Sequence, residues 1–472
     1  MEIVKEKNPL GYEKVPKLLL KFAFPSVVAM LVSSLYNIVD QIFIGHGVGF
    51  LGNAATNVSY PLTTICLVFA LLIGIGASSR FSISLGQKNE ERAKNAVVNA
   101  IILAIVFGIL YCILGMIFLK PLLNLFGATT ENFPYAYAYA SITIIGTPFL
   151  ILNHVISNLA RADGSPRYSM LCMVVGAVLN TILDPIFMFV FSMGIKGAAL
   201  ATIISQIVSC FVSILYLFRF RRIKLKLEDF KDFDIKHSLK IMSLGLSNAT
   251  NQLALLILQI VINNSLTHYG ALSIYGEDIP LSAFGLVMKI NSIFLGVFIG
   301  VNQGAQPIYG FNYGAKKYDR VKEVYKWAIS ICAVLATIAF CLFEFTPHIF
   351  INLFGSSDNE LYVEFMRMGM RIYLSTIVLN AIQLLSANFF SAIGKPQRGV
   401  ILVLARQVVF VIPFLIVFPL FFGVKGILYA TPTSDIIAFI ITLIFIVFEM
   451  KKLTKMQKEQ EDELLFSNVE KN

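Results

Sequence analysis

Charged residues are scarce in this chain. Asp, Glu, Lys and Arg make up 14% of its 472 residues, whereas hydrophobic residues make up 57% and the mean hydropathy is +0.75. An ordinary soluble domain carries about 25% charged residues. The shortage therefore excludes an ordinary soluble globular protein and predicts a polytopic membrane protein.

Motifs of enzymes and of metal sites are also missing from the sequence. It contains no HExxH, GxSxG or P-loop motif, and His154 has no acidic residue three or four positions further along its own predicted helix. The five histidines lack ligand spacing, and the six cysteines lack CxxC spacing and fall within apolar runs. We therefore expect no enzymatic activity, such as intramembrane proteolysis or lipid processing, no cofactor or structural metal, and packed thiols.

Apolar runs recur along the whole sequence, each with about 20 residues, enough to cross roughly 30 Å of hydrocarbon. The first run is too long for a signal peptide and lacks a cleavage site of small residues, so we expect it to remain in the mature chain. The runs predict an all-α membrane protein of about twelve transmembrane helices, at 18-44, 54-80, 96-119, 135-159, 168-192, 197-218, 241-266, 282-309, 327-346, 362-389, 400-422 and 426-449.

The placement of Lys and Arg predicts the orientation of the chain in the membrane. With both termini in the cytoplasm, most Lys and Arg lie in the loops and tails of that side, and the opposite loops hold only Lys120, Lys196 and Lys425. The formal net charge of +10 therefore indicates contact with a lipid bilayer. We expect no nucleic-acid partner, because the basic stretches lack the alternating aromatic residues of a stacking surface.

The two halves of the sequence resemble each other. Gly86-Gln87-Lys88 matches Gly314-Ala315-Lys316 at an offset of 228 residues, and Glu91-Arg92-Ala93-Lys94 matches Asp319-Arg320-Val321-Lys322 at the same offset. Later blocks, such as Gly164-Ser165-Pro166 and Gly394-Lys395-Pro396, drift by a residue or two. So many spaced matches indicate an internal duplication.

The duplication predicts the organisation of the chain. We expect a six-helix lobe at 1-218, a cytoplasmic amphipathic linker at 219-240, a second six-helix lobe at 241-450 and a charged cytoplasmic tail at 451-472. Because each repeat holds an even number of spans, the repeats are parallel and enter the membrane in the same orientation. Two such lobes around a central cleft suit transport by alternating access, and the alternative is a rigid scaffold of duplicated bundles.

Two acidic residues lie within the predicted spans of the first half. Asp184 precedes Pro185 and lies one helical turn after Asn180, and Asp40 lies near the outer end of its own span. A carboxylate in hydrocarbon costs several kcal/mol or more, so it usually faces a cavity and marks an ion or proton pathway. Pro185 removes a backbone donor, which leaves carbonyl oxygens available nearby. The alternative is that both acids are structural and bonded to neighbouring polar groups.

Several segments together resemble the multidrug and toxic compound extrusion (MATE) family, and more closely its prokaryotic DinF-like and MepA-like branch. The resemblance covers about residues 14 to 450, and the segments that carry it are Lys21-Phe22-Ala23-Phe24-Pro25, Asn37-Ile38-Val39-Asp40, Gly86-Gln87-Lys88, Arg161-Ala162-Asp163-Gly164 and Asn180 to Pro185. The resemblance implies a two-lobed antiporter that expels amphiphilic organic cations in exchange for Na+ or H+. It also implies a monomer in a bacterial or archaeal plasma membrane.

The same resemblance implies roles for individual residues. The cation site of the family's N-terminal lobe is matched here by Asp40, Asn180, Asp184 and Thr202. Positions linked to a rearrangement of the first helix are matched by Tyr36 and Pro25. Counted along their helices, Asp40, Asp184 and Thr202 all lie within roughly 6 to 12 Å of the outer boundary. Their oxygen atoms suit either a hard monovalent cation or a shared proton. The alternative for Thr202 is a packing hydroxyl bonded to a backbone carbonyl.

The second half of the chain keeps different charges within its spans. These are Lys289, Arg371 and Asp435, and Arg406 lies nearer the inner side. Because lone charges at this depth are costly, we expect Asp435 to pair with Lys289 or Arg371. We expect Arg406 to pair with inner-side carbonyl groups or with phosphate head groups.

The leading hypothesis from the sequence is therefore a secondary antiporter. The runner-up is a flippase for a lipid-linked saccharide precursor of the same superfamily, whose cavity needs positive charge to hold a diphosphate. Lys289, Arg371 and Arg406 are compatible with such a cavity. The buried acids of the first half argue against it.

Overall fold

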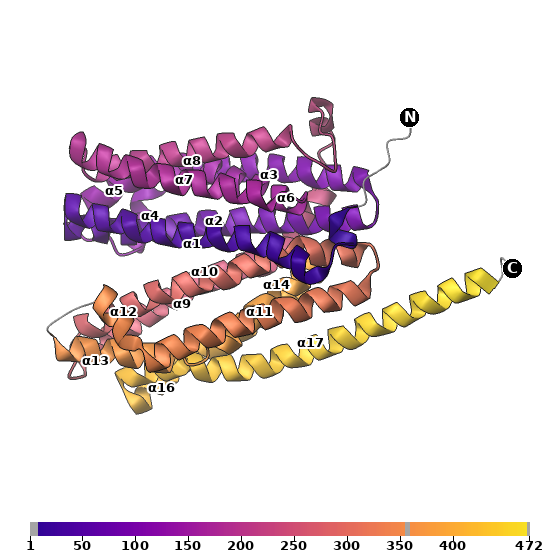
Figure 1. Cartoon of the computed structure of the whole chain (residues 1–472). Helices are drawn as coiled ribbons and strands as arrows, with labels where there is room; N and C mark the ends of the chain where they lie inside the picture. Colours follow the sequence, from indigo (N-terminus) through magenta and orange to yellow (C-terminus); the bar gives the residue numbers. More distant parts are fainter. Residues whose placement is uncertain (1–7, 355–358, 470–472) are drawn as a thin grey trace. The chain divides into compact units, whose positions relative to one another are not determined.

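The computed structural model describes residues 8–354 and 359–469, and this part of the chain is almost wholly helical and has no β-strand (Figure 1). The α-helices are α1 (Val15–Val48), α2 (Phe50–Gly86), α3 (Glu90–Ile117), α4 (Leu119–Leu125), α5 (Phe133–Thr143), α6 (Thr147–Ala162), α7 (Pro166–Pro185), α8 (Ile195–Leu217), α9 (Ile235–Ala271), α10 (Asp278–Gly314), α11 (Tyr318–Phe345), α12 (Pro347–Phe354), α13 (Glu360–Met368), α14 (Ile377–Ala392), α15 (Pro396–Leu404), α16 (Ile412–Phe422) and α17 (Val424–Val469). Short 3₁₀ turns are η1 (Pro9–Gly11), η2 (Ile144–Gly146) and η4 (Leu227–Lys231), and wider π-helical turns are η3 (Ile186–Val190), η5 (Gly369–Tyr373) and η6 (Ala405–Val411).

The helices are long and apolar enough to span a membrane many times. Within the described residues ten continuous helical stretches meet this condition, and the pair Glu360–Tyr373 and Ile377–Ala392, bent by 51°, brings the number to eleven. The last predicted span, 426-449, lies within α17. The prediction of an all-α, multi-pass membrane protein is confirmed. The sequence did not predict the π-helical turns, of which η5 and η6 interrupt a span and η3 ends one.

The chain forms two compact units. One unit runs from Lys21 to Leu253, and the other contains the residues up to Leu20 together with those from Ala254 onward. Both divisions fall inside a helix, the first within α1 and the second within α9. The start of α1, up to Leu20, therefore belongs to the second of these units, and the rest of α1 to the first. The part of α9 up to Leu253 belongs to the first unit, and the rest of α9 to the second. We call the units the N-terminal unit and the C-terminal unit.

Corresponding turns of the two halves adopt the same backbone conformation. Lys88 and Lys316, at matching positions after α2 and α10, have φ angles of 59° and 58°. Gly164 and Gly394, after α6 and α14, have φ angles of 91° and 81°. Non-glycine residues rarely adopt positive φ, so the shared geometry of the lysines is a specific feature of the repeat.

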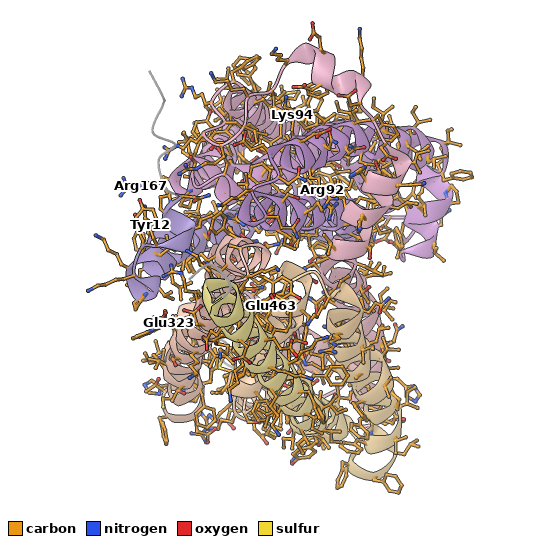
Figure 2. All side chains as sticks on the ribbon, turned by 90° about the vertical axis from the view of Figure 1, so that its right-hand side faces the viewer. Tyr12, Arg92, Lys94, Arg167, Glu323 and Glu463 are labelled. Atoms are coloured by element: carbon orange, nitrogen blue, oxygen red, sulfur yellow. The ribbon has the colours of Figure 1, made fainter. Side chains whose placement is uncertain are left out.

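The predicted linker packs on α3 within the N-terminal unit. Lys94, labelled in Figure 2, places its Nζ atom 3.1 Å from Oδ1 of Asp229 in η4. The side-chain oxygen of Asn99 accepts hydrogen bonds from the backbone N–H of Asp234 and from the hydroxyl of Ser238, both at 3.0 Å. These bonds fix the start of α9 beside α2 and α3.

Two glycines allow α2 and α9 to approach each other closely. A Cβ atom on Gly245 would lie 1.8 Å from the carbonyl oxygen of Leu72, and one on Gly76 would lie 2.0 Å from the carbonyl oxygen of Ile241. Both obstacles are backbone atoms, which cannot rotate away as a side chain can. Small residues at such a contact let helix backbones meet in a membrane protein.

We expect Gly245→Ala to separate α2 from α9 and to destabilise the fold. Overpacking of this kind costs about 1–3 kcal/mol, or more where the backbone has to move. The measurement is the melting temperature of the protein purified in detergent. Gly285→Ala is the matched control, because a Cβ atom there meets nothing within 4 Å. Equal melting temperatures for the two variants would contradict this description of the contact.

Candidate functional site

Two carboxyl groups lie together inside the N-terminal unit. Asp40 on α1 and Asp184 on α7 are within hydrogen-bonding reach of each other. Asp184 is fully buried and Asp40 is partly buried. Two carboxylates at this separation repel strongly in a poorly solvated place, and a proton or a metal cation between them removes that repulsion.

Two further predicted residues complete the cluster. The side-chain amide of Asn180 donates to Oδ1 of Asp184 at 3.2 Å and to the hydroxyl of Thr202 at 3.4 Å. The Thr202 hydroxyl donates in turn to the carbonyl oxygen of Ala198, one turn back in α8, at 3.0 Å. All four residues predicted to form a cation site are therefore in one place, and Thr202 also makes the backbone bond of the alternative interpretation.

Several oxygen atoms of the cluster lack a donor. Asp40 Oδ1, Asp184 Oδ2 and Asn180 Oδ1 are buried, and each accepts no hydrogen bond from the described residues. A buried acceptor without a partner is costly. A proton or a monovalent metal ion entering the cluster would give these oxygens a partner, and a site built only of oxygen ligands suits both.

Two tyrosines line the acidic pair. Tyr36, predicted from the sequence, lies near both acids on α1. Tyr139 on α5, which the sequence did not single out, is hydrogen-bonded to Thr202 and lies near Asp40. Two aromatic side chains therefore lie near the acidic pair.

Prolines weaken the two helices that carry the acids. Pro185 ends α7 directly after Asp184, and the chain continues in the π-helical turn η3. Pro185 has no N–H for the carbonyl oxygen of Thr181, one turn earlier. Pro25 lies inside α1, about four turns before Asp40, and likewise removes a hydrogen bond from its helix.

The C-terminal unit contains a buried ion pair, but with a different partner from the one we predicted. Asp435 on α17 is 1% exposed, and its Oδ1 atom lies 2.7 Å from Nε of Arg406 in η6. Thr376 donates to the other carboxyl oxygen at 2.8 Å, and Gln383 donates to the backbone carbonyl at 2.6 Å. The expected pairing of Asp435 with Lys289 or Arg371 is therefore wrong, as is the expected pairing of Arg406 with inner-side carbonyl groups or phosphate head groups.

The two cations named in that prediction lie elsewhere. Arg371 donates through Nε to the backbone carbonyl of Glu344 at 3.0 Å and lies 3.9 Å from the carboxyl group of the same residue. Lys289 is exposed on α10. Arg406 lies in the π-helical turn η6, where the backbone is wider than in an α-helix.

Asp163 belongs to one of the segments that carry the family resemblance. It stabilises the loop between α6 and α7 through hydrogen bonds. Its carboxyl group accepts hydrogen bonds from the hydroxyl of Tyr216 at 2.7 Å and from the backbone N–H groups of Arg221 and Arg222 at 2.6 and 3.0 Å. Burial raises the pKa of Asp163 to about 6, although these three donors oppose the shift. The residue connects this loop to the end of α8 and is structural.

Metal-ligand clusters of the usual kind do not occur in residues 8–354 and 359–469. No group of three or more His, Cys, Asp or Glu residues there is placed to hold a metal ion. The Asp40 and Asp184 cluster has only two acids, and its other oxygens come from an amide and hydroxyl groups. Oxygen atoms of this kind are the ligands that hard cations prefer.

Comparisons with known proteins agree with this architecture. The Multidrug export protein MepA of Staphylococcus aureus (strain MRSA252) is 24% identical over 460 residues, which cover 96% of this chain and 98% of that protein. A MOP superfamily transporter from Pyrococcus furiosus Vc1 (DSM3638), described with a binding pocket of reversed polarity, has the same fold, with a TM-score of 0.88, 24% identity and coverage of 94% of this chain and 98% of its own.

A multidrug resistance MATE family transporter of the MOP superfamily, solved in an outward-facing conformation, has the same fold, with a TM-score of 0.87, 24% identity and coverage of 94% and 98%. The model of the MatE family matches residues 25–186 and 249–417, one stretch in each half of the chain. These stretches make up well over half of the sequence. The chain belongs to the MatE family.

Proposed function

We propose that this protein is a secondary active exporter of amphiphilic organic cations, driven by the entry of Na+ or H+. The observation that carries the proposal is the contact between the carboxyl groups of Asp40 and Asp184, with three unpartnered buried oxygens around it. Such a site binds a positive charge, and it can bind either the coupling ion or a cationic substrate.

The relatives support export of small molecules. The staphylococcal protein is named a multidrug export protein, and one structural neighbour is a multidrug resistance transporter. The Pyrococcus furiosus transporter, described with reversed pocket polarity and a different function, has an equally similar fold. The fold alone therefore does not determine the charge of the substrate. For this chain the sign of the substrate charge rests on the acids Asp40 and Asp184.

Competition between ion and substrate gives the cycle its direction. A cationic substrate is held by the negative charge of Asp40 and Asp184, beside the rings of Tyr36 and Tyr139. When a coupling ion enters from outside and neutralises the acids, that attraction is lost and the substrate leaves. The α1 helix can bend at Pro25 as Asp40 changes partners, because the helix already lacks a hydrogen bond there.

The flippase alternative is less well supported. It needs free positive charge for a diphosphate, and we assigned that charge to Lys289, Arg371 and Arg406. Arg406 is neutralised by Asp435, and Arg371 lies near Glu344. Only Lys289 of the three has no carboxylate partner among the described residues.

Growth of a pump-deficient bacterium on cationic dyes tests the proposal. We expect the wild-type gene, with the protein as a monomer in the plasma membrane and both termini in the cytoplasm, to permit growth at dye concentrations that stop the host. A gene with Asp184→Asn should give no protection at the same level of membrane protein. No protection by the wild-type gene, with the protein present in the membrane, would contradict the proposal.

A further inference from the structure

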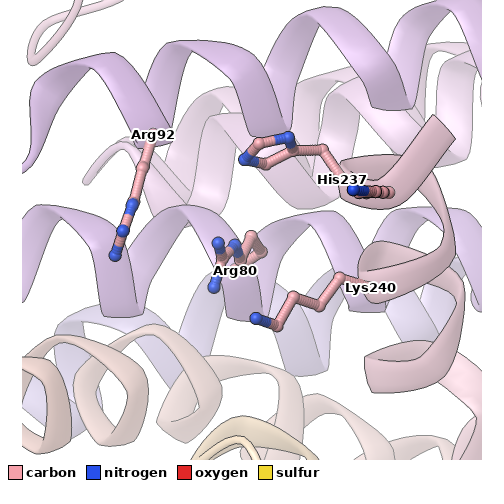
Figure 3. Close-up of a pocket in the computed structure, with 5 residues that line it drawn as sticks. Arg80, Arg92, His237 and Lys240 are labelled. Carbon is pink, nitrogen blue, oxygen red and sulfur yellow. The ribbon is translucent and has the colours of Figure 1, made fainter. Parts of the chain in front are cut away.

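A second polar site lies in the N-terminal unit, apart from the acidic pair. It is a pocket with a volume of about 270 Å³, close to the lower limit of roughly 300 Å³ for ligand pockets. All of its lining residues are basic, and they are Arg80, Arg92, Lys236, His237 and Lys240. Figure 3 shows four of them, Arg80 on α2, Arg92 on α3, and His237 and Lys240 in the first turns of α9.

The charges in this pocket are poorly compensated. Arg80 and Arg92 lie close enough to repel each other. Nε of Arg80 is buried and donates to no acceptor among the described residues. Asp234, an acid beside the pocket, places its Oδ2 atom 2.6 Å from Nδ1 of His237. This bond holds the pKa of Asp234 below its usual value.

The duplicated half of the chain provides a comparison. The residue that matches Arg92 is Arg320, which donates to the side-chain oxygen of Asn312 and to the backbone carbonyls of Leu10 and Glu13. In the C-terminal unit the equivalent arginine is therefore occupied by the protein itself. Arg92 instead points into the pocket (Figure 3).

The position that matches Arg80 also differs between the halves. At the common offset of 228 residues it is Ile308, a fully buried apolar residue. The fold therefore does not require an arginine at this place. An arginine with a buried, unpartnered nitrogen next to a second arginine is instead the arrangement expected where an anion binds.

We propose that this pocket binds a phosphate group, from either the head group of an anionic lipid or a free phosphate. Arginine holds phosphate with paired hydrogen bonds, and lysine adds positive charge. The pocket lies beside the turn between α2 and α3, on the side rich in Lys and Arg, where anionic lipids attract basic residues. A bound phosphate would join α9 to α2 and α3 where the linker ends.

Two binding measurements on the purified full-length chain test the proposal and separate the sources. Native mass spectrometry counts adducts of short-chain phosphatidylglycerol, with zwitterionic phosphatidylcholine, whose phosphate charge is balanced by its own ammonium group, as the reference of zero net charge. Calorimetry measures binding of inorganic phosphate. The test variant is Arg92→Gln with Lys240→Gln, since both side chains are exposed and line the pocket. The control is Lys224→Gln with Lys231→Gln, which removes the same charge from exposed linker residues outside the pocket.

We expect the wild-type chain to bind one of the two probes, and the pocket variant to bind it about tenfold more weakly or worse. The linker variant should stay within about twofold of the wild type, because its lysines act only through screened, long-range attraction. Adducts of phosphatidylglycerol alone identify a lipid site, and binding of inorganic phosphate identifies a site for free phosphate. Absence of binding by both probes, or equal weakening in both variants, would overturn the proposal.

Discussion

Replacing Asp184 by Asn is expected to abolish ion-driven export and to leave the helical fold intact. Asn has nearly the size of Asp, and its side-chain oxygen can still accept the hydrogen bond that Asn180 donates at 3.2 Å. The substitution removes the charge permanently, so the pair with Asp40 can no longer exchange a proton or a metal ion for a cationic substrate. Transport should fall to the rate of liposomes without protein.

The measurement is efflux of a fluorescent organic cation from proteoliposomes with an imposed Na+ or pH gradient. Asp232→Asn is the matched control, because it makes the same chemical change at an exposed position in the linker. It should transport at the wild-type rate. An Asp184→Asn protein that still followed the gradient at that rate would remove Asp184 from the mechanism.

The same assay tests whether the two acids act as one site. Asp40→Asn should also abolish coupled transport, because in the proposed mechanism Asp40 and its neighbour Asp184 share one proton or cation. The double variant should be little worse than either single variant, since effects of residues that act together are not additive. Clearly additive losses would indicate two separate sites.

Asp435→Asn is expected to destabilise the protein strongly while leaving transport per folded molecule unchanged. The substitution leaves Arg406 charged and without its carboxylate, and its side chain is only 15% exposed. Breaking a buried ion pair from one side costs about 3–5 kcal/mol. The melting temperature in detergent and the yield of membrane protein should both fall.

The double variant Asp435→Asn with Arg406→Gln separates stability from coupling. It leaves no unpaired charge, so part of the lost stability should return. Transport per folded molecule should stay near the wild-type rate in both variants. A single Asp435→Asn variant that melts normally but loses coupling would place part of the ion site in the C-terminal unit.

The acids of the candidate site were predictable because acidic residues are so rare within the apolar runs. Asp40 and Asp184 stand out in the sequence for that reason, and the structure brings them together with Asn180 and Thr202. Tyr139 was not predictable, because tyrosine is frequent here, with 18 in the chain, and occurs in spans and loops alike. Only the packing of α5 places this ring beside the acids.

The helices and the repeat were also predictable, whereas several local features were not. Long apolar runs determine membrane helices, and matching glycine-containing turns revealed the duplication, as the shared φ angles of Lys88 and Lys316 illustrate. The π-helical turn that carries Arg406 leaves no mark in the pattern of hydrophobic residues, so the partner of Asp435 was assigned wrongly. The basic pocket combines positions 80, 92 and 236–240, and only the fold brings these together.

The most direct test of the account is whether binding of a cationic drug displaces an ion from the acidic pair. Purified protein in weakly buffered detergent is mixed with drug, while a pH-sensitive dye reports released protons and equilibrium dialysis reports released radioactive Na+. We expect the wild-type protein to release one of the two ions as drug binds, and the Asp184→Asn protein to release neither. Tight binding of drug by the wild-type protein without release of either ion would contradict the account.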